Sequence, residues 1–179
     1  MKSMRAVAVA AVAVFTLLSG PALADDSFEA DAKAALQKLY DSEPVAKMIG
    51  EKAKAVLVFP SIVKAGFIVG GQYGEGVLLI HGKLVAHYNS VAASYGLQAG
   101  VQSFGYALFL MNDKAIQYLD KSDGWELGVG PSIVIVDKGK AKSLTTMTLQ
   151  DDVYAFIFDQ KGLMAGLGLQ GSKITKLEK

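Results

Sequence analysis

The sequence predicts an α+β fold. Two N-terminal helices should pack on a strongly bent, glycine-rich antiparallel sheet, barrel-like or sandwich-like, with one further helix inserted in it. Three observations predict this. Apolar residues recur at helical spacing between residues 27 and 49. From Ala55 onwards, short apolar runs alternate with turn residues. Glycines lie inside those runs, where they allow strands to bend and to approach each other closely.

Residues 27–41 predict the first helix, because one face of it collects Phe28, Ala32, Ala35, Leu36 and Leu39. Ser42 can cap a second, short helix that carries Pro44 in its first turn. The inserted helix is expected over residues 112–119, where its apolar face would consist of Ala115, Ile116 and Leu119.

The strands are expected between and after these helices. Residues 56–59 predict a short buried strand that Pro60 ends. Gly74-Glu75-Gly76 between two apolar runs predicts a hairpin, and His81-Gly82-Lys83 predicts a second turn. Further strands are expected at residues 84–91, 93–102, 104–111, 125–136, 143–149, and at 153–158 paired with 163–170.

The first 24 residues have the pattern of a secretory signal peptide. Lys2 and Arg5 precede an apolar run over residues 6–18, and Ala22-Leu23-Ala24 provides small residues for cleavage between Ala24 and Asp25. An uncleaved membrane anchor is the alternative, but the run is shorter than the roughly 20 residues that span a bilayer. We therefore expect a periplasmic protein whose mature part is a single domain over residues 25–179.

The charged residues and the absence of cysteine argue against a nucleic-acid partner and against a lipid anchor. The chain has 18 basic and 17 acidic residues, and removal of Lys2 and Arg5 leaves 16 and 17. Arg5 is the only arginine. The domain therefore lacks arginine, the side chain that forms bidentate hydrogen bonds to phosphates and to guanine edges. We expect no nucleic-acid partner. The absence of cysteine predicts that the protein is not a lipoprotein.

Nothing in the sequence predicts catalysis. Residues 166–171 match G-x-G-x-x-G, but the helix, returning strand and acidic residue of a dinucleotide site do not follow. The only histidines, His81 and His87, lack the spacing of a metal site. No G-x-S-x-G elbow is present. We expect a non-enzymatic protein without a cofactor or a metal.

The candidate binding residues lie around the strand at residues 56–59. Lys52, Lys54 and Lys64 are interpreted either as ordinary surface lysines or as contacts to anionic lipid, in which case hairpin geometry would bring them to one rim. Phe59 and Phe67 are either core residues or a wedge that inserts into lipid. These five side chains form the predicted lipid-binding site.

Five segments resemble the SYLF domain family: AVLVFPSIVKAGF at 55–67, YGEG at 73–76, ASYGLQAG at 93–100, GWELGVGP at 124–131 and GLMAGL at 162–167. The similarity as a whole spans about residues 31–175. The resemblance implies a non-enzymatic lipid-binding module. Eukaryotic SYLF proteins bind phosphoinositide membranes, fungal members with an added SH3 domain also bind actin, and bacterial members are exported, frequently as lipoproteins.

This sequence departs from that family pattern in lacking an SH3 domain, a lipoprotein cysteine and any arginine after the signal peptide. The resemblance therefore implies an anionic phospholipid membrane surface as the partner, rather than phosphoinositides or actin. An alternative hypothesis is an adaptor or structural protein of the cell envelope that binds another protein through an exposed sheet edge.

Overall fold

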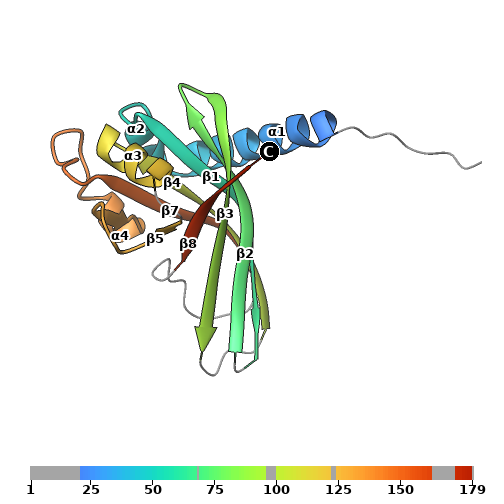
Figure 1. The fold of residues 1–179 in the computed structure, drawn as a ribbon. Coiled ribbons are helices and arrows are strands. Elements are labelled where there is room, and N and C mark those ends of the chain that lie inside the picture. The colour runs from blue at the N-terminus through green and yellow to red at the C-terminus, as the bar shows by residue number, and fades with distance from the viewer. Residues whose placement is uncertain (1–20, 68, 96–99, 122–123, 163–171, 179) are drawn as a thin grey trace, which may run out of the picture.

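The computed structural model of the chain describes residues 21–67, 69–95, 100–121, 124–162 and 172–178. Its helices are α1 (Pro21–Ser42), α2 (Pro44–Gly50), α3 (Asp113–Lys121) and α4 (Lys138–Ala141). Its strands are β1 (Ala55–Gly66), β2 (Val69–Ile80), β3 (Lys83–Tyr95), β4 (Gly100–Leu110), β5 (Trp125–Glu126), β6 (Ile133–Ile135), β7 (Val153–Gly162) and β8 (Lys173–Leu177). The predicted α+β class, with helices at the N-terminus and one helix inserted after β4, is confirmed (Figure 1).

The strands form one strongly curled sheet in the order β5-β8-β3-β2-β1-β4-β7-β6. All described pairs are antiparallel except β6 with β7, which run parallel, so the expected purely antiparallel sheet is mixed at one edge. The pairing of β8 with β3 brings the C-terminal segment beside residues 87–91 of β3, near one edge of the sheet. The sequence did not predict this strand, because residues 173–177 read as a basic tail.

Pro60 does not end its strand. β1 runs through it, and the register shifts between Phe59 and Ile62 against β4. Such a bulge suits proline, which has no N–H to donate to the ladder. The extra residue places Phe59 and Ile62 on the same side of the sheet, and both are fully buried.

The hairpin predicted at Gly74–Gly76 was wrong, because these residues lie inside β2 and pair with β3. β1 and β2 instead turn at residues 66–69. Gly76 is needed because β1 lies close against it: a Cβ atom there would stand 2.6 Å from Phe59 Cδ1 and from the Val58 carbonyl oxygen. The turn at His81-Gly82 is confirmed, with φ of 50° and 74° as in a type I′ hairpin.

Two apolar clusters cover the two sides of the sheet. We call them the α1 side and the α3 side after the helices that pack there. On the α1 side, buried residues of α1 and α2 pack on the sheet: Ala32, Leu39, Ala46 and Ile49 against Val58, Val77 and Phe109. On the α3 side, the core consists mainly of Leu57, Phe59, Tyr106, Leu108, Leu119 and Trp125.

β1 to β4 extend well beyond the helices (Figure 1). We call these projecting parts the blade, which comprises residues 62–67, 69–74, 90–95 and 100–104. α1 packs on β1 and β2, but the α1-side core ends at Val58 and Val77. The blade side chains that point to the α1 side are therefore left uncovered.

No strand forms at 143–149, where Thr145 and Thr148 close a turn through hydrogen bonds of 2.8 and 3.1 Å. The predicted strand at 163–170 and the G-x-G-x-x-G segment lie outside the described residues, as do residues 1–20 of the predicted signal peptide. The predicted cleavage point between Ala24 and Asp25 falls in the first turns of α1.

Candidate functional site

The three lysines predicted to form one rim are separated by the fold. Lys52 and Lys54 precede β1, whereas Lys64 lies near its far end. Ten strand residues span about 33 Å. Lys54 also forms an ion pair with Asp113 at 2.6 Å, and Lys64 is buried. The prediction that hairpin geometry brings these three lysines to one rim is therefore wrong, because their side chains cannot contact one small area of a membrane.

The two predicted phenylalanines have different positions. Phe59 is fully buried and stacks on Tyr106 with ring centroids 4.6 Å apart, so it belongs to the core and not to an exposed wedge. It lies two residues after Leu57, on the same side of the sheet. Phe67 lies at the end of the blade in the turn between β1 and β2, and 72% of its surface is exposed. Of the five predicted residues, Phe67 is the apolar one that could enter lipid.

Phe67 is part of a continuous exposed apolar face. Its neighbours on the α1 side of the blade come from all four strands: Val63, Ala65, Val69, Gly71, Tyr73, Val91, Ala93 and Val101. Tyr73 lies opposite Val63 on one side and opposite Val91 on the other, so the exposed side chains adjoin across the strands. Large contiguous apolar surfaces are uncommon on monomeric soluble proteins and mark sites of interaction.

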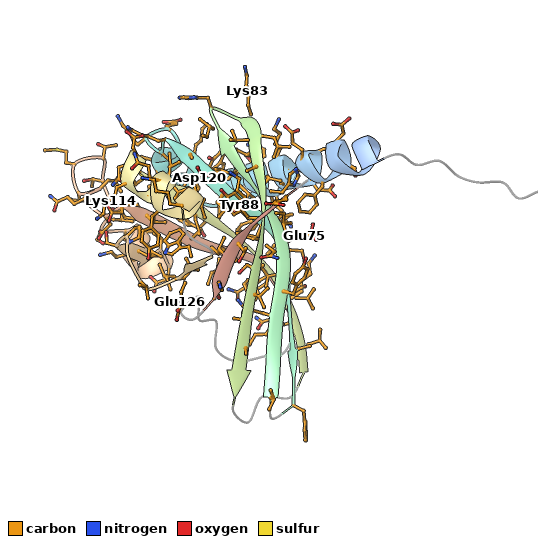
Figure 2. The ribbon with its side chains drawn as sticks, viewed as in Figure 1. Glu75, Lys83, Tyr88, Lys114, Asp120 and Glu126 are labelled. Carbon is orange, nitrogen blue, oxygen red and sulfur yellow. The ribbon has the colours of Figure 1, made fainter. Side chains whose placement is uncertain are left out.

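The blade is also depleted of charge. Lys64 is the only charged residue in segments 60–74 and 88–112, although 20% of the chain is charged. Figure 2 shows the labelled Glu75, Lys83 and Lys114 away from the lower end of the blade. Sequence reasoning missed Val69, Tyr73, Val91 and Val101, although these long uncharged segments could have pointed to them.

The opposite side of the blade is polar and buried. Gln72, Lys64 and Gln102 lie side by side on β2, β1 and β4, each less than 10% exposed. The Gln72 side-chain amide donates a hydrogen bond of 2.8 Å to Ser172 Oγ. An antiparallel sheet usually buries apolar side chains and exposes polar ones. The blade reverses this pattern, because its apolar side chains are exposed and its polar side chains are buried.

A transverse row of side chains marks the upper limit of the uncharged face. Successive register pairs place Lys173, Val91, Tyr73, Val63, Ser103 and Lys161 in line across β8, β3, β2, β1, β4 and β7. The Tyr73 hydroxyl donates to Glu75 Oε1 at 2.8 Å, and this hydrogen bond raises the pKa of the phenol. Lys161 Nζ lies 3.7 Å from Asp159 Oδ2. Lysines thus stand at both ends of the row.

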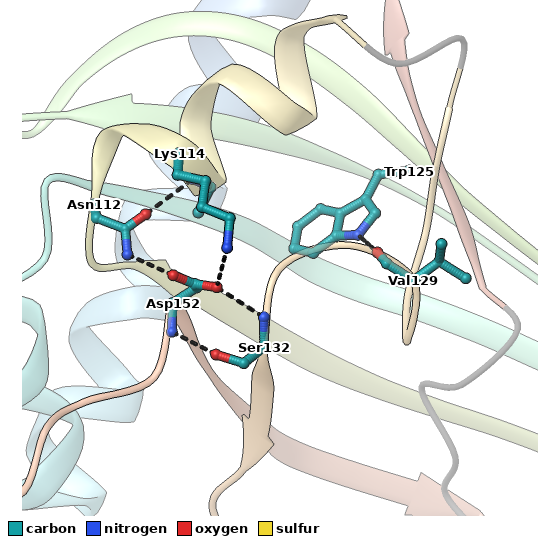
Figure 3. Close-up of polar contacts among 7 residues, drawn as sticks. Asn112, Lys114, Trp125, Val129, Ser132 and Asp152 are labelled. Atoms are coloured by element: carbon teal, nitrogen blue, oxygen red, sulfur yellow. Dashed lines mark hydrogen bonds and ion pairs between the residues drawn. The ribbon is translucent and has the colours of Figure 1, made fainter.

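A second polar cluster lies around Asp152 and has a structural role (Figure 3). Asp152 accepts hydrogen bonds from Asn112 Nδ2 at 2.7 Å, the Ser132 backbone N–H at 2.9 Å and Lys114 Nζ at 3.3 Å. The bond from Asn112, followed by that from Ser132, lowers the pKa of this carboxyl to about 2. Through these bonds Asp152 fastens the start of α3 to the starts of β6 and β7.

Two surface cavities lie near α3. One of about 370 Å³ is lined by Lys114, Gln117, Tyr118 and Lys121. The other, of about 320 Å³, is lined by Leu127, Gly128, Gly130, Pro131, Ser132, Ile133 and Ile135. Within the described ranges, no three metal-ligating side chains come together. None of the helices in the part of the chain that the structure describes is long and apolar enough to span a bilayer.

Two comparisons with known proteins bear on this architecture. Residues 91–179 match the family model Ysc84, described as Las17-binding protein actin regulator, which is the SYLF domain. The chain is also 29% identical over 143 residues to Beta cell expansion factor A of Aeromonas veronii. That match covers 79% of this chain and 53% of the relative, so the chain spans about half the length of that protein. The C-terminal half of the chain, residues 91–179, therefore matches the SYLF family, a family of binding domains.

Proposed function

We propose that this protein is a non-enzymatic lipid-binding protein of the periplasm and that the blade attaches it to the surface of a phospholipid bilayer. The reversed polarity of the blade supports this most directly, because an exposed apolar face backed by a buried polar row is suited to a nonaqueous environment. The match to this family agrees with a role in lipid or protein binding.

Apolar contact supplies most of the affinity in this proposal. Full burial of a valine or phenylalanine side chain contributes about 1.5–3 kcal/mol, and the exposed blade residues include Val63, Phe67, Val69, Val91 and Val101. Part of this free energy offsets the loss of rotational and translational freedom on binding. Lys161 and Lys173 near the headgroups would add about 1 kcal/mol each on an anionic surface. Anionic phospholipid is therefore the preferred ligand, and neutral bilayers bind more weakly.

Matched valine substitutions on β3 test the proposal. Val91 lies on the blade and Val85 lies at the other end of the same strand, and their exposed fractions are 45% and 56%. We expect Val91→Asp to reduce co-sedimentation with phosphatidylglycerol-containing vesicles at least tenfold, because anionic headgroups repel a carboxylate at this position and its hydration opposes the lipid contact of the neighbouring apolar side chains. Val85→Asp should bind like the natural protein. Equal binding by both variants would exclude the blade as the contact surface.

Export forms part of the proposal and has its own test. Cleavage between Ala24 and Asp25 would leave Asp25 and Asp26 at the start of α1, where acidic groups stabilise a helix N-terminus. We expect the intact mass of the protein isolated from the periplasm to correspond to residues 25–179. A mass that includes residues 1–24 would contradict a cleaved signal peptide.

The alternative of an adaptor that binds through an open sheet edge has less support. The outermost strands, β5 and β6, contain two and three residues. β7 extends past β6, but this part has a register shift, the positive φ of Asp159 and the charge of Lys161. Bulges and charges of this kind protect edge strands from pairing with other chains.

A further inference from the structure

We infer that the blade enters a single leaflet of the bilayer end-on, with the row Lys173–Val91–Tyr73–Val63–Ser103–Lys161 at the level of the lipid headgroups. We call this row the belt. The inference rests on the proposed function, and it adds an orientation, a depth and two headgroup contacts to it. The register of the strands, the position of α1 and the distribution of charge carry it.

The belt has the residues that favour a membrane interface. Tyr73 stands near its centre, about half exposed, and tyrosine is enriched where hydrocarbon meets water. Lys161 and Lys173 stand at its two ends. Long lysine side chains can keep their apolar stems on the protein while the ammonium groups reach phosphate. Lys161 is well exposed, and its 3.7 Å ion pair with Asp159 leaves it able to reorient.

The part of the blade beyond the belt has the length of one leaflet. Phe67 lies four positions after Val63, which corresponds to about 13 Å in an extended chain. Half of the roughly 30 Å hydrocarbon core is about 15 Å. Among the described residues of this part, none is an exposed charge, since Lys64 points to the α3 side and is buried. The blade can therefore reach the middle of the bilayer without taking an exposed charge into the hydrocarbon.

The position of α1 excludes flat contact with the apolar face. α1 packs on the same side of the sheet, and it extends past the edge of the sheet (Figure 1). A helix with its side chains is about 10–12 Å thick. A planar bilayer would meet α1 before it touched Val91 and Val101 together. Entry from the end that carries Phe67 avoids this obstruction.

Spin labels can measure the orientation, because the chain has no cysteine. Single cysteines would be introduced as Phe67→Cys, Val101→Cys, Val91→Cys and Val85→Cys, each labelled with a nitroxide. Depth would be measured by paramagnetic accessibility on phosphatidylglycerol–phosphatidylcholine vesicles. Val101 lies opposite Ala65, two residues past the belt. We expect its label about 7 Å deeper than the label at Val91, and the label at Phe67 about 13 Å deeper. The label at Val85 should stay in water.

The possible outcomes separate this inference from the proposed function. Equal depths at 67, 101 and 91 would overturn end-on entry while leaving lipid binding by the blade intact. Four labels in water on vesicle-bound protein would show that another surface binds, and would overturn both. An absence of vesicle binding by the unlabelled protein would likewise overturn both. Unchanged thermal midpoints would confirm that each labelled protein is folded.

A paired lysine substitution tests the belt itself. We expect Lys161→Gln with Lys173→Gln to weaken binding to phosphatidylglycerol vesicles roughly thirtyfold, the effect of two lysines near an anionic surface. Binding to phosphatidylcholine vesicles should change little. Lys52→Gln with Lys83→Gln removes two exposed lysines away from the blade and serves as the control. Equal effects of the two pairs would overturn the assignment of Lys161 and Lys173 to the headgroups.

Discussion

At the residue scale, the glycines of β2 show how one sequence feature can have two physical causes. Gly74-Glu75-Gly76 resembles a turn, but both glycines lie in extended strand and neither has a positive φ. Gly76 is required because the β1 residues Val58 and Phe59 leave no room for a side chain. At Gly71, in the same strand, an added Cβ atom would have only the Ala92 carbonyl oxygen within 4 Å, at a distance of 3.7 Å.

This difference predicts different effects of alanine at the two positions. We expect Gly76→Ala to lower the free energy of unfolding by about 1–3 kcal/mol, because the added methyl group overpacks the β1–β2 contact. Gly71→Ala should change it by less than about 0.5 kcal/mol, as is usual for exposed positions. Urea denaturation of the two variants measures both effects. Equal midpoints would show that the β1 backbone and Phe59 can move aside.

At the element scale, Asp152 joins three elements that are distant in sequence. Asn112 and Lys114 reach it from the start of α3, and Ser132 reaches it from the residue before β6. Ser132 Oγ also accepts a hydrogen bond of 2.9 Å from the Asp152 backbone N–H. The carboxylate therefore holds together a region in which β6 has only three residues.

The lowered pKa of Asp152 predicts a loss of stability in acid. The pKa is about 2 in the folded protein and 3.8 for the ordinary group. The folded state therefore binds the proton less readily than the unfolded state does. The resulting stabilisation is present above about pH 4 and is lost as the pH falls from about 4 to 2. Asp152→Asn should make the free energy of unfolding, measured with urea, fall less steeply in this range, and Asp31→Asn on the exposed face of α1 serves as the control.

At the scale of the whole molecule, the charges are distributed unevenly between two regions. The helices and the part of the sheet outside the blade carry the charged surface, whereas the blade is nearly free of charge. A membrane attachment built on scattered lysines would fail at high salt. An attachment built on the blade would depend mainly on apolar burial, which salt does not screen.

Salt dependence therefore distinguishes these two modes of attachment. We expect binding to phosphatidylglycerol vesicles to weaken roughly thirtyfold or less between 0.1 and 0.5 M NaCl, because only Lys161 and Lys173 contribute at the headgroups. Binding to phosphatidylcholine vesicles should stay nearly constant over the same range. Complete release from anionic vesicles at 0.5 M NaCl would show that electrostatic attraction dominates and that the blade does not insert.

Local sequence patterns were enough to predict the α+β class, helices α1, α2 and α3, the turn at His81-Gly82 and the SYLF resemblance. These features depend on local periodicity and short motifs. Which side chains reach the surface depends on the folded sheet. The bulge at Pro60 sets which side Ile62, Val63 and Lys64 face relative to Phe59, because an added residue reverses the alternation of a strand. To predict the belt, one would have to know the registers of six strands at once. Such nonlocal pairing follows from the packing of the whole sheet, so no local stretch of sequence predicts it.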